Sequence, residues 1–149
     1  MSADLRDLYQ EMVLDHGRHP RNLRSMDNAT AQSVGFNPLC GDKLTLFLRY
    51  ENDRLVDASF QGSGCAISTA SASLLTETVQ GKTRREVEEL IATFLEMLTG
   101  SGAADAEKLG KLMVLGGVRE FPVRVKCATL SWRTLEAAMR GGAKEVTTE

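Results

Sequence analysis

The sequence lacks the features by which membrane, secreted and nucleic-acid-binding proteins are usually recognised. No apolar run approaches the roughly 18 residues that a membrane-spanning helix requires. Basic residues (18) do not outnumber acidic ones (20), so only a local basic patch, suited to a protein partner, is compatible with the charge balance. The N-terminal segment MSADLRDLYQEMVLDHG carries acidic residues throughout, which favours neither a secretory signal nor a transit peptide. We therefore expect a cytoplasmic protein that binds neither membranes nor nucleic acids.

Cysteine is also scarce, and its pattern argues against a disulfide scaffold. Cys40, Cys65 and Cys127 are the only three in the chain. An odd number cannot all pair internally, and the cytoplasm keeps thiols reduced. The separations of 25 and 62 residues contain no Cys-x-x-Cys pair of the kind that marks a zinc knuckle. Spacing alone therefore leaves open that each cysteine is simply a small buried residue.

The length and the apolar pattern favour one α+β domain. The chain has 149 residues, of which 42% are hydrophobic and 26% charged, enough for a single core. Alternating apolar residues predict strands in the first half, and helical spacing predicts helices in the second. The expected strands cover 30–36, 44–50 and 55–60, and the expected helices cover 4–16, 66–78, 105–115 and 126–140, with one more opened by the capping box of Thr83 and Glu86.

We accordingly expect a small antiparallel sheet of about three strands, packed against several helices. A single domain is expected to span residues 1–149, with a loose tail over 142–149.

Each cysteine lies at the edge of an expected element, beside small or flexible residues. In Leu39-Cys40-Gly41-Asp42 the glycine allows a sharp turn, which would let the Cys40 thiol and the Asp42 carboxylate converge. Cys65 follows a Gly-Ser-Gly segment and begins a helix, and Cys127 lies near the expected start of the last helix. These positions at element edges favour a shared functional site over three unrelated buried cysteines.

Two of the thiols are predicted to ionise easily. A helix N-terminus stabilises a thiolate, and this applies to Cys65 and Cys127 as placed above. Arg124 and Lys126 would act on Cys127 in the same direction.

Three thiolates and the Asp42 carboxylate would make a four-ligand tetrahedral set, suited to Zn²⁺ or to the iron of an iron–sulfur cluster. Closed structural zinc sites are usually built from Cys and His alone. An oxygen ligand beside thiolates therefore suggests a ligand set that can exchange and leave one thiolate open to chemistry.

Three segments carry a resemblance to a known family. LCGDKLTLFL, FQGSGCAIS and RVKCATLSW, together with the N-terminal YQEMVLDHGRHPRN, resemble the U-type iron–sulfur assembly proteins, which have a SufE/NifU-like fold. Within that family the chain is most similar to the SufU branch. IscU-type scaffolds carry a His where this chain has Lys126, and they have a shorter segment between the second and third cysteines, so that residues 98–117 resemble an insertion. Their LPPVK chaperone-recognition motif is also absent here.

The resemblance implies a zinc-dependent sulfurtransferase. Cys40, Asp42, Cys65 and Cys127 would bind one Zn²⁺, and Cys40 would accept persulfide sulfur from a SufS-type cysteine desulfurase. A His of that enzyme would replace Cys40 on zinc, and the sulfur would pass to a downstream iron–sulfur scaffold or another acceptor. We add the hypothesis that Arg124 is catalytic, by stabilising the freed thiolate.

Two alternatives stay open. The chain could be a scaffold that assembles a transient [2Fe–2S] cluster on the same Cys and Asp ligands. It could also be a structural zinc protein that serves as an interaction module, a reading that the Asp42 ligand disfavours.

Overall fold

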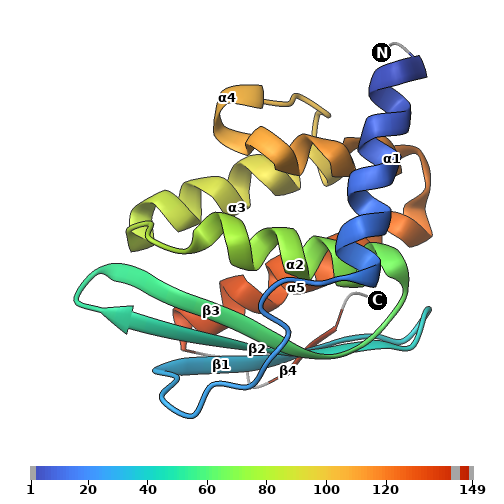
Figure 1. The fold of residues 1–149 in the computed structure, drawn as a ribbon. Helices are drawn as coiled ribbons and strands as arrows, with labels where there is room; N and C mark the ends of the chain where they lie inside the picture. Colours follow the sequence, from blue (N-terminus) through green and yellow to red (C-terminus); the bar gives the residue numbers. More distant parts are fainter. Residues whose placement is uncertain (1–2, 142–144, 148–149) are drawn as a thin grey trace.

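The computed structural model describes residues 3–141 and 145–147, and its strands form one four-stranded sheet (Figure 1). β1 (Ala31–Asn37), β2 (Asp42–Glu51) and β3 (Arg54–Ser63) pair antiparallel as successive hairpins. β4 (Glu145–Thr147) pairs parallel with β1, so the strand order is β3-β2-β1-β4. The expected α+β class is confirmed, and β4 is a strand that sequence periodicity did not predict.

The fourth strand corrects the expectation of a loose tail for residues 145–147. Pairing with the backbone of β1 orders this segment, a long-range interaction that tail composition does not reveal. The rest of the expected tail, residues 142–144 and 148–149, lies outside the described residues.

The helices gather on one face of the sheet (Figure 1). α2 and α5 pack directly on the strands, and α1, α3 and the segment that links α3 to α5 cover α2 and α5 in turn. Their bounds are α1 Ala3–Arg18, α2 Ala66–Val79, α3 Arg84–Thr99, α4 Ala106–Leu109, the 3₁₀ helix η1 Gly110–Glu120 and α5 Pro122–Arg140.

The core forms where apolar strand residues meet the inner helices. Leu44, Leu46 and Leu48 alternate with less buried residues along β2, so every second side chain of that strand faces α2 and α5. Trp132 of α5 is fully buried and stacks on Phe94 of α3, with ring centroids 4.3 Å apart. These contacts hold the helix that carries the third cysteine against the sheet.

Two helices differ from the sequence prediction by more than two residues at one boundary. The helix expected over 105–115 is α-helical only at Ala106–Leu109, and Gly110, with φ +52°, begins the 3₁₀ segment η1. The last helix begins at Pro122 instead of 126, because proline is well suited to the first helical position. The capping box of Thr83 and Glu86 is present as predicted.

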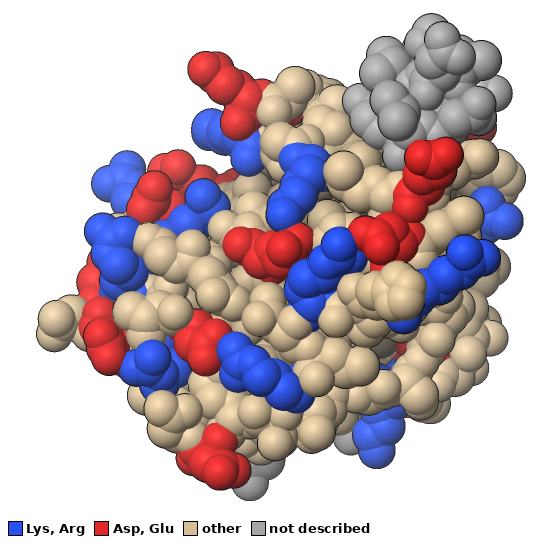
Figure 2. Space-filling model, in the orientation of Figure 1, with Lys and Arg blue, Asp and Glu red and all other residues tan. Residues whose placement is uncertain are grey.

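Charge on the molecule is mixed rather than segregated on the face seen in Figure 2, where basic and acidic side chains alternate. Across residues 3–141 and 145–147, no helix is long and apolar enough to cross a membrane.

Buried His16 joins the end of α1 to α2. Its Nδ1 lies 2.7 Å from the Ser73 hydroxyl oxygen, which also accepts a hydrogen bond from the Arg21 N–H at 2.9 Å. Its Nε2 lies 3.7 Å from the Glu77 carboxylate. Burial is the main cause that lowers the pKa of His16, and the positive charges of Arg21 and Lys111 act in the same direction. The folded state therefore favours the neutral imidazole.

We expect His16→Ala to lower the free energy of unfolding by about 2 kcal/mol near neutral pH, because it removes a buried hydrogen bond and leaves a cavity. Since the folded-state pKa is lowered, the unfolded chain binds more protons. The wild type should therefore lose stability as the pH falls through the ordinary histidine pKa of about 6.5, and the variant should lose less. Urea unfolding on both sides of that pH measures both effects.

The matched control is His19→Ala, which removes an exposed histidine. It should leave stability near neutral pH within about 0.5 kcal/mol of the wild type. Equal losses for the two variants would show that the His16 contacts do not stabilise the fold.

Candidate metal centre

The site begins at the turn between β1 and β2, where Cys40 is exposed. The carbonyl oxygen of Asn37 accepts hydrogen bonds from the N–H groups of Cys40 (3.3 Å) and Gly41 (2.9 Å). Gly41 has φ +71°, a conformation that favours glycine and lets the chain reverse into β2. The strand register then places Asn37 directly opposite Asp42.

Asp42 is fully buried at the start of β2 and connects the hairpin to the helix that follows β3. Its Oδ1 accepts a hydrogen bond from the backbone N–H of Cys65 at 2.8 Å. Gly64 makes this approach possible, because a Cβ at residue 64 would lie only 2.7 Å from the same carboxylate oxygen. The glycine of the Gly-Ser-Gly segment therefore has a steric role at the site.

Cys65 is the N-cap residue of α2, as the sequence predicts. Its sulfur accepts a hydrogen bond from the Ser68 N–H at 3.4 Å, and it lies 4.0 Å from Oδ2 of Asp42. The side chain therefore sits between the helix N-terminus and the buried carboxylate.

Cys127 approaches from α5 and completes the group. Its sulfur is buried and lies 3.2 Å from the sulfur of Cys40, although both thiols are free. The ligand atoms of Cys40, Asp42 and Cys127 all lie within 4.8 Å of one another. Cys65 lies beside Asp42 but outside this closest group of three, so the structure places all four residues singled out in the sequence in one neighbourhood.

The environment of Cys127 differs from the sequence prediction. The thiol was expected to ionise easily near a helix start, but α5 begins at Pro122 and places Cys127 in its second turn. Burial therefore dominates and raises the pKa of Cys127, and the neighbouring side chains of Cys40, Cys65 and Asp42 raise it further. The prediction of a low pKa for Cys127 is wrong for the cluster without a cation.

The donor set fits a divalent metal ion. Three sulfurs and one carboxylate oxygen match the ligand types of zinc, and the atoms around tetrahedral zinc lie roughly 3–4 Å from one another. The separations of 3.2 Å between Cys40 and Cys127 and 4.0 Å between Cys65 and Asp42 are of that size. A bound cation favours the deprotonated form of a coordinating thiol. It would therefore offset the effect of burial, which disfavours ionisation of Cys127.

Asn37 is a site residue that the cysteine motifs of the sequence do not indicate. It is fully buried, and its Nδ2 lies 3.4 Å from Oδ2 of Asp42 and 3.6 Å from the sulfur of Cys127. An amide donor so placed orients both side chains and supports their negative charge. The hairpin register could have indicated Asn37 from the sequence, since a four-residue turn at 38–41 pairs Asn37 with Asp42.

Arg124 lies on the exposed first turn of α5, three residues before Cys127. Its guanidinium carbon is 4.7 Å from the ring centroid of Phe121. The structure therefore places the side chain on the surface of α5, stacked on an exposed aromatic ring.

Comparison with known proteins gives consistent family matches. A sequence model described as NifU-like N terminal domain matches residues 8–128. The zinc-dependent sulfurtransferase SufU of Bacillus subtilis (strain 168) is 39% identical over 144 residues, covering 97% of this chain and 95% of that protein. The iron–sulfur cluster assembly scaffold protein IscU of Streptococcus pyogenes serotype M1 is 38% identical over 141 residues, covering 95% and 88%.

Solved structures agree with the sequence matches. FiSufU from the thermophile Fervidobacterium islandicum AW-1 superposes with a TM-score of 0.84 at 34% identity, covering 93% of this chain and 99% of that one. The N-terminal NifU-like protein of Brucella abortus has a TM-score of 0.82 at 20% identity, covering 91% and 94%, and therefore supports the fold alone. These similarities confirm the resemblance that the three cysteine motifs carry.

We expect Gly64→Ala to displace the Asp42 carboxylate, because the added Cβ would meet its oxygen at 2.7 Å. Zinc binding, measured by competition with a coloured chelator, should weaken about tenfold. The free energy of unfolding of the metal-free protein should fall by about 1–3 kcal/mol.

Gly117→Ala is the matched control, since a Cβ at that position meets no atom within 4 Å. It should leave zinc affinity unchanged. If both variants bind zinc equally well, Gly64 does not shape the site through Asp42.

Proposed function

This chain belongs to the family of NifU-like N-terminal domains, and from that premise we propose that it is a zinc-dependent sulfurtransferase for iron–sulfur cluster assembly. It accepts persulfide sulfur on Cys40 from a SufS-type cysteine desulfurase. A downstream iron–sulfur scaffold or another acceptor then takes the sulfur. The reaction takes place in the cytoplasm, without a membrane or a nucleic acid as partner.

One observation carries the proposal: Cys40 is the one exposed member of a ligand group whose other members are buried or half-buried. Cys40 is exposed at the tip of a turn, whereas Asp42 and Cys127 are buried beneath it. A buried, fully enclosed set would suit a purely structural metal site. The exposed position of Cys40 lets a persulfide on another protein reach its sulfur.

Cys40, Asp42, Cys65 and Cys127 would hold the zinc ion. Zinc would supply the positive charge that keeps these thiols deprotonated at neutral pH. Asn37 orients Asp42 and Cys127 through its side-chain amide, so the ligands keep their arrangement while Cys40 reacts.

The chemical step is a thiolate attack on a persulfide. The Cys40 thiolate attacks the terminal sulfur of the desulfurase persulfide, and a new sulfur–sulfur bond forms at Cys40. The bond between that terminal sulfur and the desulfurase cysteine breaks, and this cysteine leaves as a thiolate. No electrons are gained or lost overall, so the step needs no external oxidant or reductant.

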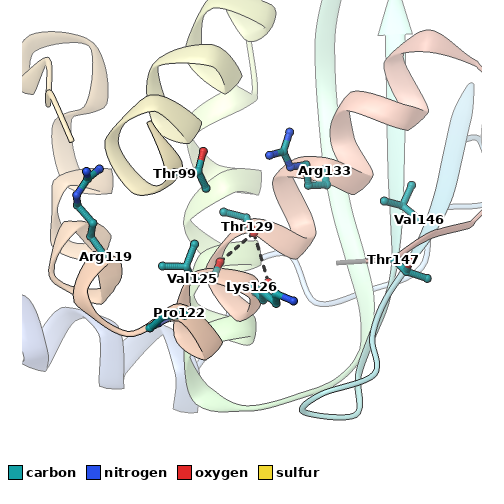
Figure 3. A pocket seen from close by; sticks show the side chains of 9 residues that line it. All are labelled: Thr99, Arg119, Pro122, Val125, Lys126, Thr129, Arg133, Val146 and Thr147. Atoms are coloured by element: carbon teal, nitrogen blue, oxygen red, sulfur yellow. Dashed lines mark hydrogen bonds between the residues drawn. The ribbon is translucent and has the colours of Figure 1, made fainter. Parts of the chain in front are cut away.

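A second candidate function is the assembly of a transient [2Fe–2S] cluster on the same ligands. It is favoured by the thiolate-rich donor set, which also suits iron, and by the similarity to a protein named as a scaffold. The side chain of Lys126 argues against it. Lysine is a poor metal ligand, and in this chain it lines a cavity on an adjacent face of α5 (Figure 3).

We expect Cys40→Ser to abolish the stimulation of a SufS-type desulfurase by this chain, because a serine hydroxyl is not deprotonated near neutral pH and does not form a persulfide. The measurement is alanine release from cysteine, with mass spectrometry of the chain to detect one added sulfur atom. The metal content of the aerobically purified wild type should be one zinc per chain.

The control is Ser63→Ala, an exposed substitution near the site that keeps all four ligands. Its stimulation should match the wild type. A wild type that gives no stimulation, yet holds a stable coloured cluster after anaerobic reconstitution with iron and sulfide, would favour the scaffold function instead.

We further expect Arg124→Ala to slow sulfur acceptance about tenfold. The reason is that the Arg124 guanidinium would stabilise the Cys40 thiolate after moving away from the Phe121 ring. Arg124→Lys keeps the positive charge and should recover part of the rate. Zinc content should not change in either variant, which separates this role from a structural one.

Arg85→Ala, which removes an arginine side chain that is 88% exposed on α3, serves as the control. Sulfur acceptance by Arg124→Ala at the same rate as this control would remove Arg124 from the mechanism.

A further inference from the structure

A groove runs along the outer face of α5, on the side of the helix that carries Lys126 and Arg133 (Figure 3). Its volume is about 490 Å³. Side chains from the end of α3, the end of η1, the first three turns of α5 and strand β4 line it: Thr99, Arg119, Pro122, Val125, Lys126, Thr129, Arg133, Val146 and Thr147.

The charges in the groove are of one sign. Arg119, Lys126 and Arg133 contribute three cations, and none of the nine lining residues is acidic. Within the described part of the chain, none of the three forms an ion pair, whereas Arg21, Arg24 and others do. Arg119 is partly engaged, since it donates to the Met97 carbonyl oxygen at 3.2 Å. Hydrogen bonds from Ser101 are the main cause that lowers the pKa of the Glu96 carboxyl, and the charge of Arg119 acts in the same direction.

Lys126 and Arg133 are the stronger indication of a ligand. Both side chains are half-buried, and a partly desolvated cation without an acidic partner has an unfavourable environment. An anionic ligand would supply the missing negative charge.

The threonines that α3 and α5 contribute to the groove already have partners for their protons. Thr129 donates to the carbonyl oxygen of Val125 at 2.9 Å, and Thr99 donates to that of Leu95 at 2.7 Å. Among the lining residues that the helices contribute, the free hydrogen-bond donors are therefore those of the cations. This favours a ligand that offers acceptors only, such as carboxylates.

The spacing of the lining residues indicates an extended ligand. Pro122, Val125, Lys126, Thr129 and Arg133 share one face of α5, and the stretch from 122 to 133 is about 16 Å long. That length matches about five residues of extended peptide, and it exceeds what one phosphate group can contact. Val125 and Val146 add apolar surface to the groove. An uncharged side chain of the ligand, flanked by acidic ones, would pack against this surface.

We propose that this groove binds an extended acidic segment of the protein that delivers sulfur to Cys40. The proposal rests on the function proposed above, because it takes the sulfur donor as the protein seated at Cys40. Lys126 in the groove directly precedes Cys127, whose sulfur is 3.2 Å from that of Cys40. A protein docked over Cys40 therefore has the groove at the border of its contact surface.

The first experiment tests the groove without sulfur chemistry. The probe is a synthetic capped peptide, Glu-Asp-Leu-Glu-Asp, and its neutral analogue Gln-Asn-Leu-Gln-Asn, titrated into the full-length zinc-loaded chain and followed by amide NMR. The acidic peptide should shift signals of α5 and β4, bind less tightly as salt is raised, and bind more tightly than the analogue. The double variant Lys126→Glu/Arg133→Glu should weaken binding about tenfold or more.

Two further variants keep this test interpretable. Lys126→Gln/Arg133→Gln removes the charges without reversing them and should give an intermediate affinity. Arg85→Glu/Lys108→Glu makes the same charge change on exposed residues of α3 and α4 and should bind like the wild type. Equal binding of both peptides, or equal weakening by the groove and control variants, would overturn the proposal, as would tighter binding of a single-stranded RNA oligonucleotide at the same residues.

The second experiment tests the link to the sulfur donor. In alanine-release assays with a SufS-type desulfurase, the groove variant Lys126→Glu/Arg133→Glu should raise the KM for this chain about tenfold, and the control variant should not. An unchanged KM would overturn the assignment to the sulfur donor. If the wild-type chain gives no stimulation at all, the proposed function fails, and the peptide titration still decides whether the groove binds an acidic segment.

Discussion

The site depends on a buried carboxylate whose charge needs partners. An aspartate removed from water is strongly unfavourable unless hydrogen-bond donors or a cation satisfy it. Asp42 is fully buried, accepts the backbone N–H of Cys65, and lies within reach of the Asn37 amide. These contacts hold the end of the β1–β2 hairpin against the start of α2. The absence of a side chain at Gly64 leaves the space in which they meet.

Around that carboxylate, two thiols lie close together in opposite environments. Cys40 is exposed on a turn, and Cys127 is buried in a helix, yet their sulfurs are 3.2 Å apart. Burial raises the pKa of Cys127, so the group as a whole is poorly suited to negative charge without a cation. Metal binding by this group would therefore be coupled to thiolate formation, and Cys40 is the member whose sulfur another protein could reach.

Different faces of helix α5 contact different parts of the molecule. The inner face carries Cys127 to the ligand group and buries Trp132 against α3, which limits how far the helix can shift. An outer face presents Lys126 and Arg133 to the groove beside β4 (Figure 3). Because successive residues of a helix are rotated by about 100°, the adjacent residues Lys126 and Cys127 point to different surfaces. The candidate metal centre and the cationic groove are consequently held at a constant spacing.

The sequence by itself determined the α+β class, the three antiparallel strands, the capping box of α3 and the residues Cys40, Asp42, Cys65 and Cys127 as a group, because local periodicity and short motifs encode these features. The tertiary structure alone decided the rest. β4 depends on pairing with a distant strand, and the partners of Asn37 depend on the hairpin register. The raised pKa of Cys127 depends on burial by elements far apart in the chain, and the groove joins α3, η1, α5 and β4. Desolvation and long-range contacts arise only when such segments pack together, and no local pattern of residues records them.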